Sequence, residues 1–90
     1  MADNRRYELG MAQRRVLFRL TIFHEEGDKG YDKNCYEFQK ELKVVLGQDA
    51  TINSAPFMVD SMIFKITVPF EREEEAYDII KSLVERYFPN

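Results

Sequence analysis

Residues 15–24 alternate between two sets of side chains, and this alternation is the feature that most limits what the chain can fold into. One set is Val16, Phe18, Leu20 and Ile22, and the other is Arg15, Leu17, Arg19 and Thr21. A period of two places the two sets on opposite faces of a β-strand. We therefore predict a strand over residues 15–24 that turns one apolar face toward a core.

The segment after this strand has the features of an amphipathic helix over residues 33–46. Asp32 is the predicted N-cap, and Tyr31 and Tyr36 have the spacing of a hydrophobic staple. Gly47 is placed to end the helix. The predicted buried stripe of this helix consists of Cys35, Phe38, Leu42, Val45 and Leu46.

Two further strands, residues 50–59 and 62–70, are predicted around the polar pair Asp60-Ser61, which fits a hairpin turn. Pro56 places the first of these strands at a sheet edge or interrupts it, because proline has no amide hydrogen to donate. In the second strand, the residues predicted to face the core are Met62, Phe64, Ile66 and Val68.

A second helix is predicted over residues 71–87. Its apolar stripe consists of Ala76, Ile79, Ile80, Leu83, Val84 and Tyr87. Four glutamates crowd its first turns, where the helix dipole favours negative charge. These glutamates are Glu71, Glu73, Glu74 and Glu75.

The predicted order is β-α-β-β-α, which we interpret as an α+β, ferredoxin-like fold that lacks its fourth strand. A right-handed crossover followed by a hairpin gives an antiparallel or mixed three-stranded sheet of order 1-3-2, with both helices on one face. Residues 14–90 form this single domain, and residues 1–13 form a basic amino-terminal segment that is either an edge strand or flexible. The open edge of the first strand is then filled by residues 6–11 or by another molecule.

The composition favours one small cytoplasmic domain. The chain has 90 residues, of which 44% are hydrophobic, and it contains no apolar run long enough to span a membrane. The first residues lack the apolar stretch of a signal peptide. A single cysteine, Cys35, excludes an internal disulfide and agrees with a reducing compartment. We predict a cytoplasmic location and no contact with membranes.

Charge is distributed unevenly along the chain. The formal net charge is -3, yet residues 1–19 hold five arginines against Asp3 and Glu8. The arginines that could contact nucleic acid or an acidic protein surface are Arg5, Arg6, Arg14 and Arg15. The alternative is that they line a solvated edge strand, where positive charge discourages unwanted pairing.

The loop Gly27-Asp28-Lys29-Gly30 has the spacing of the phosphate-clamping loop of KH domains and precedes a predicted helix. Its acidic neighbours, Glu25, Glu26 and Asp32, repel a polyanion at the place where it must approach most closely. The spacing of a calcium-binding loop is absent. We therefore favour an ordinary turn here.

His24 and Cys35 flank this loop, as a general base and a nucleophile must if they are to meet. Cys35 lies near the predicted start of a helix, where a thiolate is favoured. It also falls on the apolar stripe of that helix, so we favour a buried, inert thiol. We predict no catalytic residue, no metal, no cofactor and no enzymatic activity.

Residues 64–83, FKITVPFEREEEAYDIIKSL, resemble the strand and helix of the small dimerisation subunit of the KEOPS tRNA-modification complex. The matching residues are Val68, Pro69, Phe70, Ala76, Ser82 and Leu83. The matched segment is about a fifth of the chain; it opens the domain in that family and closes it here. The resemblance implies a non-catalytic subunit with a β-α-β-β-α order.

The face of the predicted sheet that no helix covers is the candidate binding surface. Its side chains are Leu17, Arg19, Thr21, Phe23, Ile63, Lys65 and Thr67, and the candidate partner-binding residues are Leu17, Arg19, Phe23, Ile63 and Lys65. A mixture of apolar and basic groups suits a protein partner, and a single aromatic residue offers little for base stacking.

We therefore predict a non-catalytic protein-interaction module, which either self-associates or acts as a small regulatory subunit or inhibitor. Self-association is expected through the helix-free face or through the free edge of the first strand. An inhibitor that presents carboxylates would use Glu71, Glu73, Glu74, Glu75, Asp78 and Glu85. The alternative is an RNA- or DNA-binding domain that uses the amino-terminal arginines and the open face of the sheet.

Overall fold

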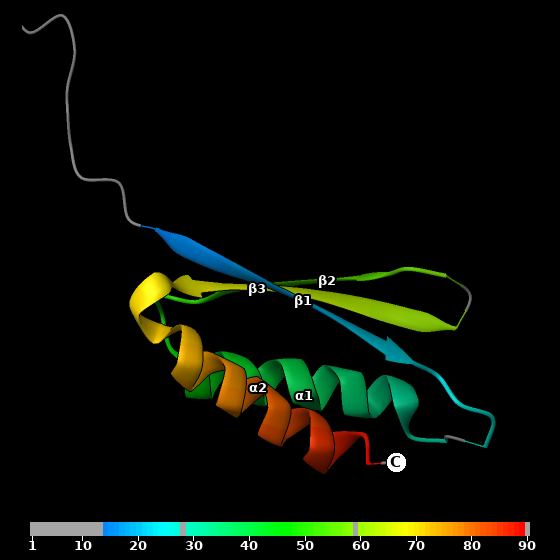
Figure 1. Ribbon diagram of the computed structural model, residues 1–90. Helices are drawn as coiled ribbons and strands as arrows, with labels where there is room; N and C mark the ends of the chain where they lie inside the picture. Colours follow the sequence, from blue (N-terminus) through cyan, green and yellow to red (C-terminus); the bar gives the residue numbers. More distant parts are fainter. Residues whose placement is uncertain (1–13, 28, 59, 90) are drawn as a thin grey trace, which may run out of the picture.

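The computed structural model describes residues 14–27, 29–58 and 60–89. The elements are β1 (Arg15–Phe23), α1 (Tyr31–Leu46), β2 (Thr51–Pro56), β3 (Ser61–Pro69), the 3-10 turn η1 (Phe70–Arg72) and α2 (Glu73–Tyr87). Figure 1 shows a three-stranded sheet with both helices on the same side of it. The predicted α+β class and the order β-α-β-β-α are confirmed, while the prediction for residues 1–13 lies outside the described residues.

The sheet has the order β1-β3-β2, and β3 pairs antiparallel with both of its neighbours. The register places Val16 opposite Val68 and Ile52 opposite Ile66. Because β1 and β2 both run against β3, the connection through α1 joins two strands that point the same way. The predicted order 1-3-2 is therefore confirmed.

The core lies between the sheet and the two helices, and the predicted faces of β1 and β3 are correct. Phe64, Ile66 and Val68 of β3 are fully buried against the helices. Phe38 of α1 lies at the centre, with its ring 5.2 Å edge-on from that of Phe64. The other buried members of this core are Ile22, Tyr31, Cys35, Leu42, Leu46, Ala76, Ile80 and Leu83.

The predicted beginning of α1 is wrong by two residues. Gly30, and not Asp32, is the N-cap, because the carbonyl of Gly30 accepts the first helical hydrogen bond from the amide of Asn34 at 2.7 Å. Tyr31 is drawn into the helix because it lies four residues before Cys35 and extends the buried stripe. The predicted staple is also wrong, since Tyr36 is exposed on the outer face.

Three other details of the elements differ from the prediction. Val45 is partly exposed in the last turn of α1, where Leu46 fills the end of the core instead. β2 ends at Pro56 and β3 already begins at Ser61, and the amide of Phe57 donates to the carbonyl of Ser61 at 3.1 Å. Pro69 holds an extended backbone with φ -58° and ψ 146°, so η1 forms before α2 begins.

Candidate functional site

The face of the sheet opposite the helices, which we call the open face, exposes large apolar side chains. Leu17 and Phe23 of β1 are 58% and 61% exposed. Phe57, just after β2, is 43% exposed on the same face, where the guanidinium of Arg19 lies 5.9 Å from its ring centre. The sequence predicted one aromatic residue on this face, Phe23. Phe57 is a second aromatic residue, and its odd-numbered position directly after Pro56 was the available signal that it lies on this face.

Ile63 is the one predicted surface residue that the structure corrects. Its side chain points to the open face but is only 6% exposed. The reason is the position of β3 in the centre of the sheet, where Thr21 of β1 and Ala55 of β2 flank Ile63 on both sides. Ile63 therefore packs between its neighbours on the open face and offers a partner little contact area.

The open face is basic, whereas α2 is acidic. The three strands carry Arg15, Arg19 and Lys65 and no acidic residue. The charged residues of α2 are Glu73, Glu74, Glu75, Asp78 and Glu85 against Lys81 and Arg86. The two layers of the domain thus have opposite charge, and the apolar side chains of the sheet lie among cations.

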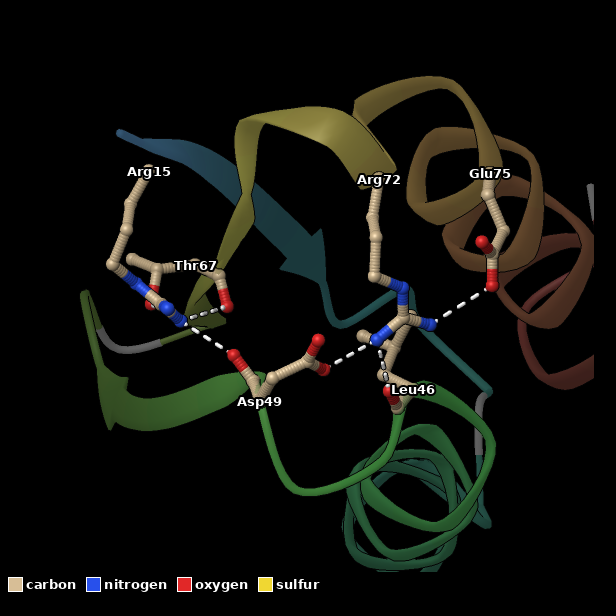
Figure 2. Close-up of polar contacts among 6 residues, drawn as sticks. All are labelled: Arg15, Leu46, Asp49, Thr67, Arg72 and Glu75. Carbon is tan, nitrogen blue, oxygen red and sulfur yellow. Dashed lines mark hydrogen bonds and ion pairs between the residues drawn. The ribbon is translucent and has the colours of Figure 1, made fainter. Parts of the chain in front are cut away.

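Two arginines converge on Asp49, and Figure 2 shows this cluster, which we call the Asp49 clamp. Arg15 donates to the carbonyl of Asp49 at 2.7 Å and to the carbonyl and hydroxyl of Thr67 at 3.1 and 3.2 Å. Arg72 forms an ion pair with the Asp49 carboxylate. It also donates to the carbonyl of Leu46 at 2.6 Å and to the carboxylate of Glu75 at 2.9 Å.

The clamp joins β1, β3, the end of α1 and the start of α2 through two guanidinium groups. The hydrogen bond to Glu75 is the main cause that raises the pKa of Arg72 above its usual value, and Asp49 adds to this effect. The carbonyl of Leu46 lies in the last turn of α1, where helical carbonyls lack an internal partner. Arg72 supplies that partner, so the clamp is structural.

We expect Arg72→Met to lower the free energy of unfolding by about 1–3 kcal/mol, because the carbonyl of Leu46 loses a charged donor. The matched control is Arg86→Met, which removes an exposed arginine paired with Glu41 at 2.9 Å and should change stability by less than about 0.5 kcal/mol. Urea unfolding followed by circular dichroism measures both. Equal effects of the two substitutions would contradict the structural role of the clamp.

The clamp also bears on the proposed nucleic-acid contacts. Arg15 is engaged within the domain, and the guanidinium of Arg14 lies 4.7 Å from the ring centre of Phe70. Arg5 and Arg6 lie outside the described residues. Of the four arginines predicted to contact nucleic acid, the two that the structure describes, Arg14 and Arg15, thus have partners in their own chain.

Cys35 is buried, as predicted for an inert thiol. Its neighbour Tyr31 donates a hydrogen bond of 2.7 Å to the carbonyl of Ile22, and the ring of His24 lies 4.7 Å from that of Tyr31. Burial raises the pKa of Tyr31 to about 12, with a further contribution from Cys35. These contacts anchor the start of α1 to the end of β1.

The loop between β1 and α1 shows the geometry of a turn. Gly27 has a φ of 87°, which favours glycine, and Gly30 caps α1. Asp28 lies outside the described residues, so the prediction for the intact four-residue loop stays a prediction. Among the residues that the structure describes, no group of three or more His, Cys, Asp or Glu side chains is arranged to hold a metal ion.

A cleft of about 890 Å³ opens between the end of β1 and the end of α2. Ile22, Val84 and Phe88 contribute apolar walls, while Glu25 and Glu85 contribute carboxylates. Sequence reasoning did not predict this cleft, because it depends on how α2 lies against β1. The apolar residues at the carboxyl end of α2 were its only sequence signal.

Within the described ranges, no helix is long and apolar enough to cross a membrane. Comparison of the chain with protein-family models, curated proteins and solved structures gives no match. The features of the chain that bear on its function are the open face, the cleft and the opposite charge of the two layers.

Proposed function

We propose that this chain is a non-catalytic protein-interaction module, which either self-associates or acts as a small subunit or inhibitor in a larger assembly. The observation that carries the proposal is the exposure of Leu17, Phe23 and Phe57 on a face that no described helix covers. Large apolar side chains exposed together on one face of a small domain are a feature of contact surfaces.

The chemistry of the open face fits a protein partner. Interface cores are enriched in aromatic residues and arginine, and Arg19 lies over Phe57 in such a combination. Lys65 of β3 lies directly across from Arg19, so the centre of the open face is cationic. A partner that brings apolar side chains together with carboxylates would satisfy both features.

Nucleic-acid binding is the second candidate, and Phe57 is the observation that favours it. Two aromatic rings, Phe23 and Phe57, together with cationic strands could stack and neutralise single-stranded nucleic acid. The protein partner has the stronger support, because Arg14 and Arg15 already hold partners within the domain.

We also propose that the domain is a ferredoxin-like sheet without its fourth strand, located in the cytoplasm. The order β-α-β-β-α and the position of β1 at an edge of the sheet support the first part. The single cysteine, Cys35, supports the second part, because a cysteine outside any disulfide is typical of a reducing compartment.

Affinity capture from an extract of the source cells tests the proposed function. We expect the double variant Phe57→Ser with Lys65→Glu to lose proteins that the native chain retains, because it removes an apolar anchor and reverses a charge on the open face. The matched control is Val44→Ser with Lys40→Glu, which changes the same residue types on the exposed face of α1.

Proteins retained by the native chain and by the α1 control, and lost with the open-face variant, support the proposal. Equal capture by all three chains contradicts a partner bound on the open face, and the absence of any retained protein contradicts the subunit or inhibitor form of the proposal. The two open-face substitutions lie on β3 and in the turn after β2. They leave the free edge of β1 unchanged.

A further inference from the structure

The outer edge of β1 has no neighbouring strand among the described residues. Two bonds define which of its backbone groups point outward: the amide of His24 donates to Asp60, and the carbonyl of Arg14 accepts from Phe70. Even-numbered residues of β1 therefore bond toward β3. In an antiparallel ladder the bonding side alternates, so odd-numbered residues direct their amides and carbonyls to the outer edge.

The sequence along this edge is complementary to the same sequence in a second copy that runs antiparallel to it. With Leu20 as the centre, the pairs that lie within β1 are Leu17 and Phe23, Phe18 and Ile22, and Arg19 and Thr21. The sequence match continues past the end of the strand with Val16 and His24, Arg15 and Glu25, and Arg14 and Glu26. The outermost two pairs have opposite charge but lie beyond the carboxyl end of β1, and the pairs within β1 are mainly apolar. No pair brings two like charges together.

We propose that two copies of this chain pair through β1, antiparallel, with Leu20 opposite Leu20 of the second copy. The two sheets then form one continuous six-stranded sheet whose helices lie on one side. This inference rests on the self-associating form of the proposed function and names the partner, the edge and the register. A two-fold axis perpendicular to the sheet relates the copies, which makes the interface closed.

Charge and exposure select this register over its neighbours. A shift one step toward the amino terminus places Arg19 opposite Arg19 of the second copy, and like charges directly opposite each other are unfavourable. A shift one step the other way places Leu17 opposite Glu25. In the proposed register, Leu17 covers Phe23 of the second copy, so two exposed apolar side chains of each chain become paired.

The cleft lies on the helix side of the sheet, at the carboxyl end of this edge. Val16 and Phe18 of the second copy fall opposite His24 and Ile22, on the helix side of the sheet. This is where the 890 Å³ cleft is lined by Ile22, Val84 and Phe88. Pairing through the open faces instead would bring the cationic strands of the two copies together, which repulsion opposes.

Thr21→Pro tests the edge. The amide of Thr21 points outward, so a proline there keeps the β1–β3 bonds and blocks only the pairing with a second copy. We expect the native chain to be a dimer in sedimentation and light scattering, and the variant to dissociate about 100-fold more readily, as expected for lost edge pairing. The control is Ser54→Pro, an outward position on the opposite edge strand β2 that should stay dimeric.

Leu20→Cys in a Cys35→Ala background tests the register. Even-numbered residues form the non-hydrogen-bonded pairs across the new interface, with α-carbons about 4.5 Å apart, within disulfide range. We expect mild oxidation to give a covalent dimer. Phe18→Cys alone should not cross-link, whereas an equal mixture with Ile22→Cys should.

Each contrary result has a distinct meaning. A native monomer at about 1 mM overturns the pairing, and a dimeric Thr21→Pro variant overturns the choice of edge. A dimer without the Leu20→Cys cross-link overturns the register. Hydrogen exchange distinguishes one further case. If the protein is a monomer and its outward amides are nevertheless protected, another segment of the same chain covers the edge; these amides are those of Leu17, Arg19, Thr21 and Phe23. The affinity capture with the Phe57→Ser, Lys65→Glu variant does not depend on any of these outcomes. It therefore tests the proposed function separately.

Discussion

Phe38→Ala is expected to lower the free energy of unfolding by about 3–5 kcal/mol, a large share of the roughly 5–15 kcal/mol available to a small domain. Phe38 has no exposed surface. Its ring lies 5.2 Å from Phe64, 6.2 Å from Tyr87 and 5.7 Å from Phe88, each nearly perpendicular. Alanine would remove the ring that joins β3, α1 and the end of α2, and would leave a cavity among three aromatic side chains.

Urea unfolding measured by circular dichroism checks this expectation. The matched control is Tyr36→Ala, which removes an aromatic ring from the exposed face of the same helix and should change stability by less than about 0.5 kcal/mol. If Phe38→Ala costs less than about 1.5 kcal/mol, α1 does not pack on the sheet as described.

The spacing of hydrophobic residues along the sequence predicted most of this fold. The even-numbered residues of β1 and β3 face the core as expected: Ile22, Phe64, Ile66 and Val68 are buried, and Val16, Phe18, Leu20 and Met62 are partly buried against it. The stripe through Phe38 and Leu42 is buried. The period of the hydrophobic residues predicts to which face of the sheet a side chain points. It does not predict how far neighbouring residues cover that side chain. Ile63 shows the difference, because it points away from the helices and is buried by its neighbours in the central strand.

Local signals were less reliable than period. Asp32 is a favourable N-cap residue, yet Gly30 holds that position because the buried contacts of Tyr31 extend α1 toward the loop. The propensity of one side chain for a cap is worth about 1 kcal/mol, and burial of a tyrosine outweighs it. Tertiary packing therefore decided where the helix begins.

The candidate site was predicted in part. Leu17, Arg19, Phe23 and Lys65 lie on the open face as expected. The Asp49 clamp was missed, because Arg15 and Arg72 are 57 positions apart in the chain and only the register of the sheet brings them together. Phe57 was missed because the predicted strand was extended past Pro56, which hid the turn that exposes the ring.

The double variant Leu17→Glu with Phe23→Glu is expected to abolish self-association while the domain stays folded. Both side chains lie on the open face, so the free energy of unfolding should change by less than about 1 kcal/mol. In the proposed pairing, each glutamate faces a glutamate of the second copy. Like charges across an interface cost several kcal/mol, so dimer dissociation should become at least about 100-fold easier.

Light scattering reports association in this experiment, and urea unfolding reports stability. The control is Tyr36→Glu with Val44→Glu, which adds the same charges to exposed apolar positions of α1 and should remain dimeric. A dimeric Leu17→Glu, Phe23→Glu variant would exclude both the open face and the β1 edge as the contact. An unfolded variant would show that these residues face the core.

A charge-matched version separates the register from a general effect of charge. Leu17→Glu combined with Phe23→Lys places a glutamate opposite a lysine of the second copy at both ends of the pair, because Leu17 and Phe23 lie opposite each other only when Leu20 is at the centre. We expect this variant to associate more strongly than the variant with two glutamates. If the two variants dissociate equally, the two strands do not pair in this register.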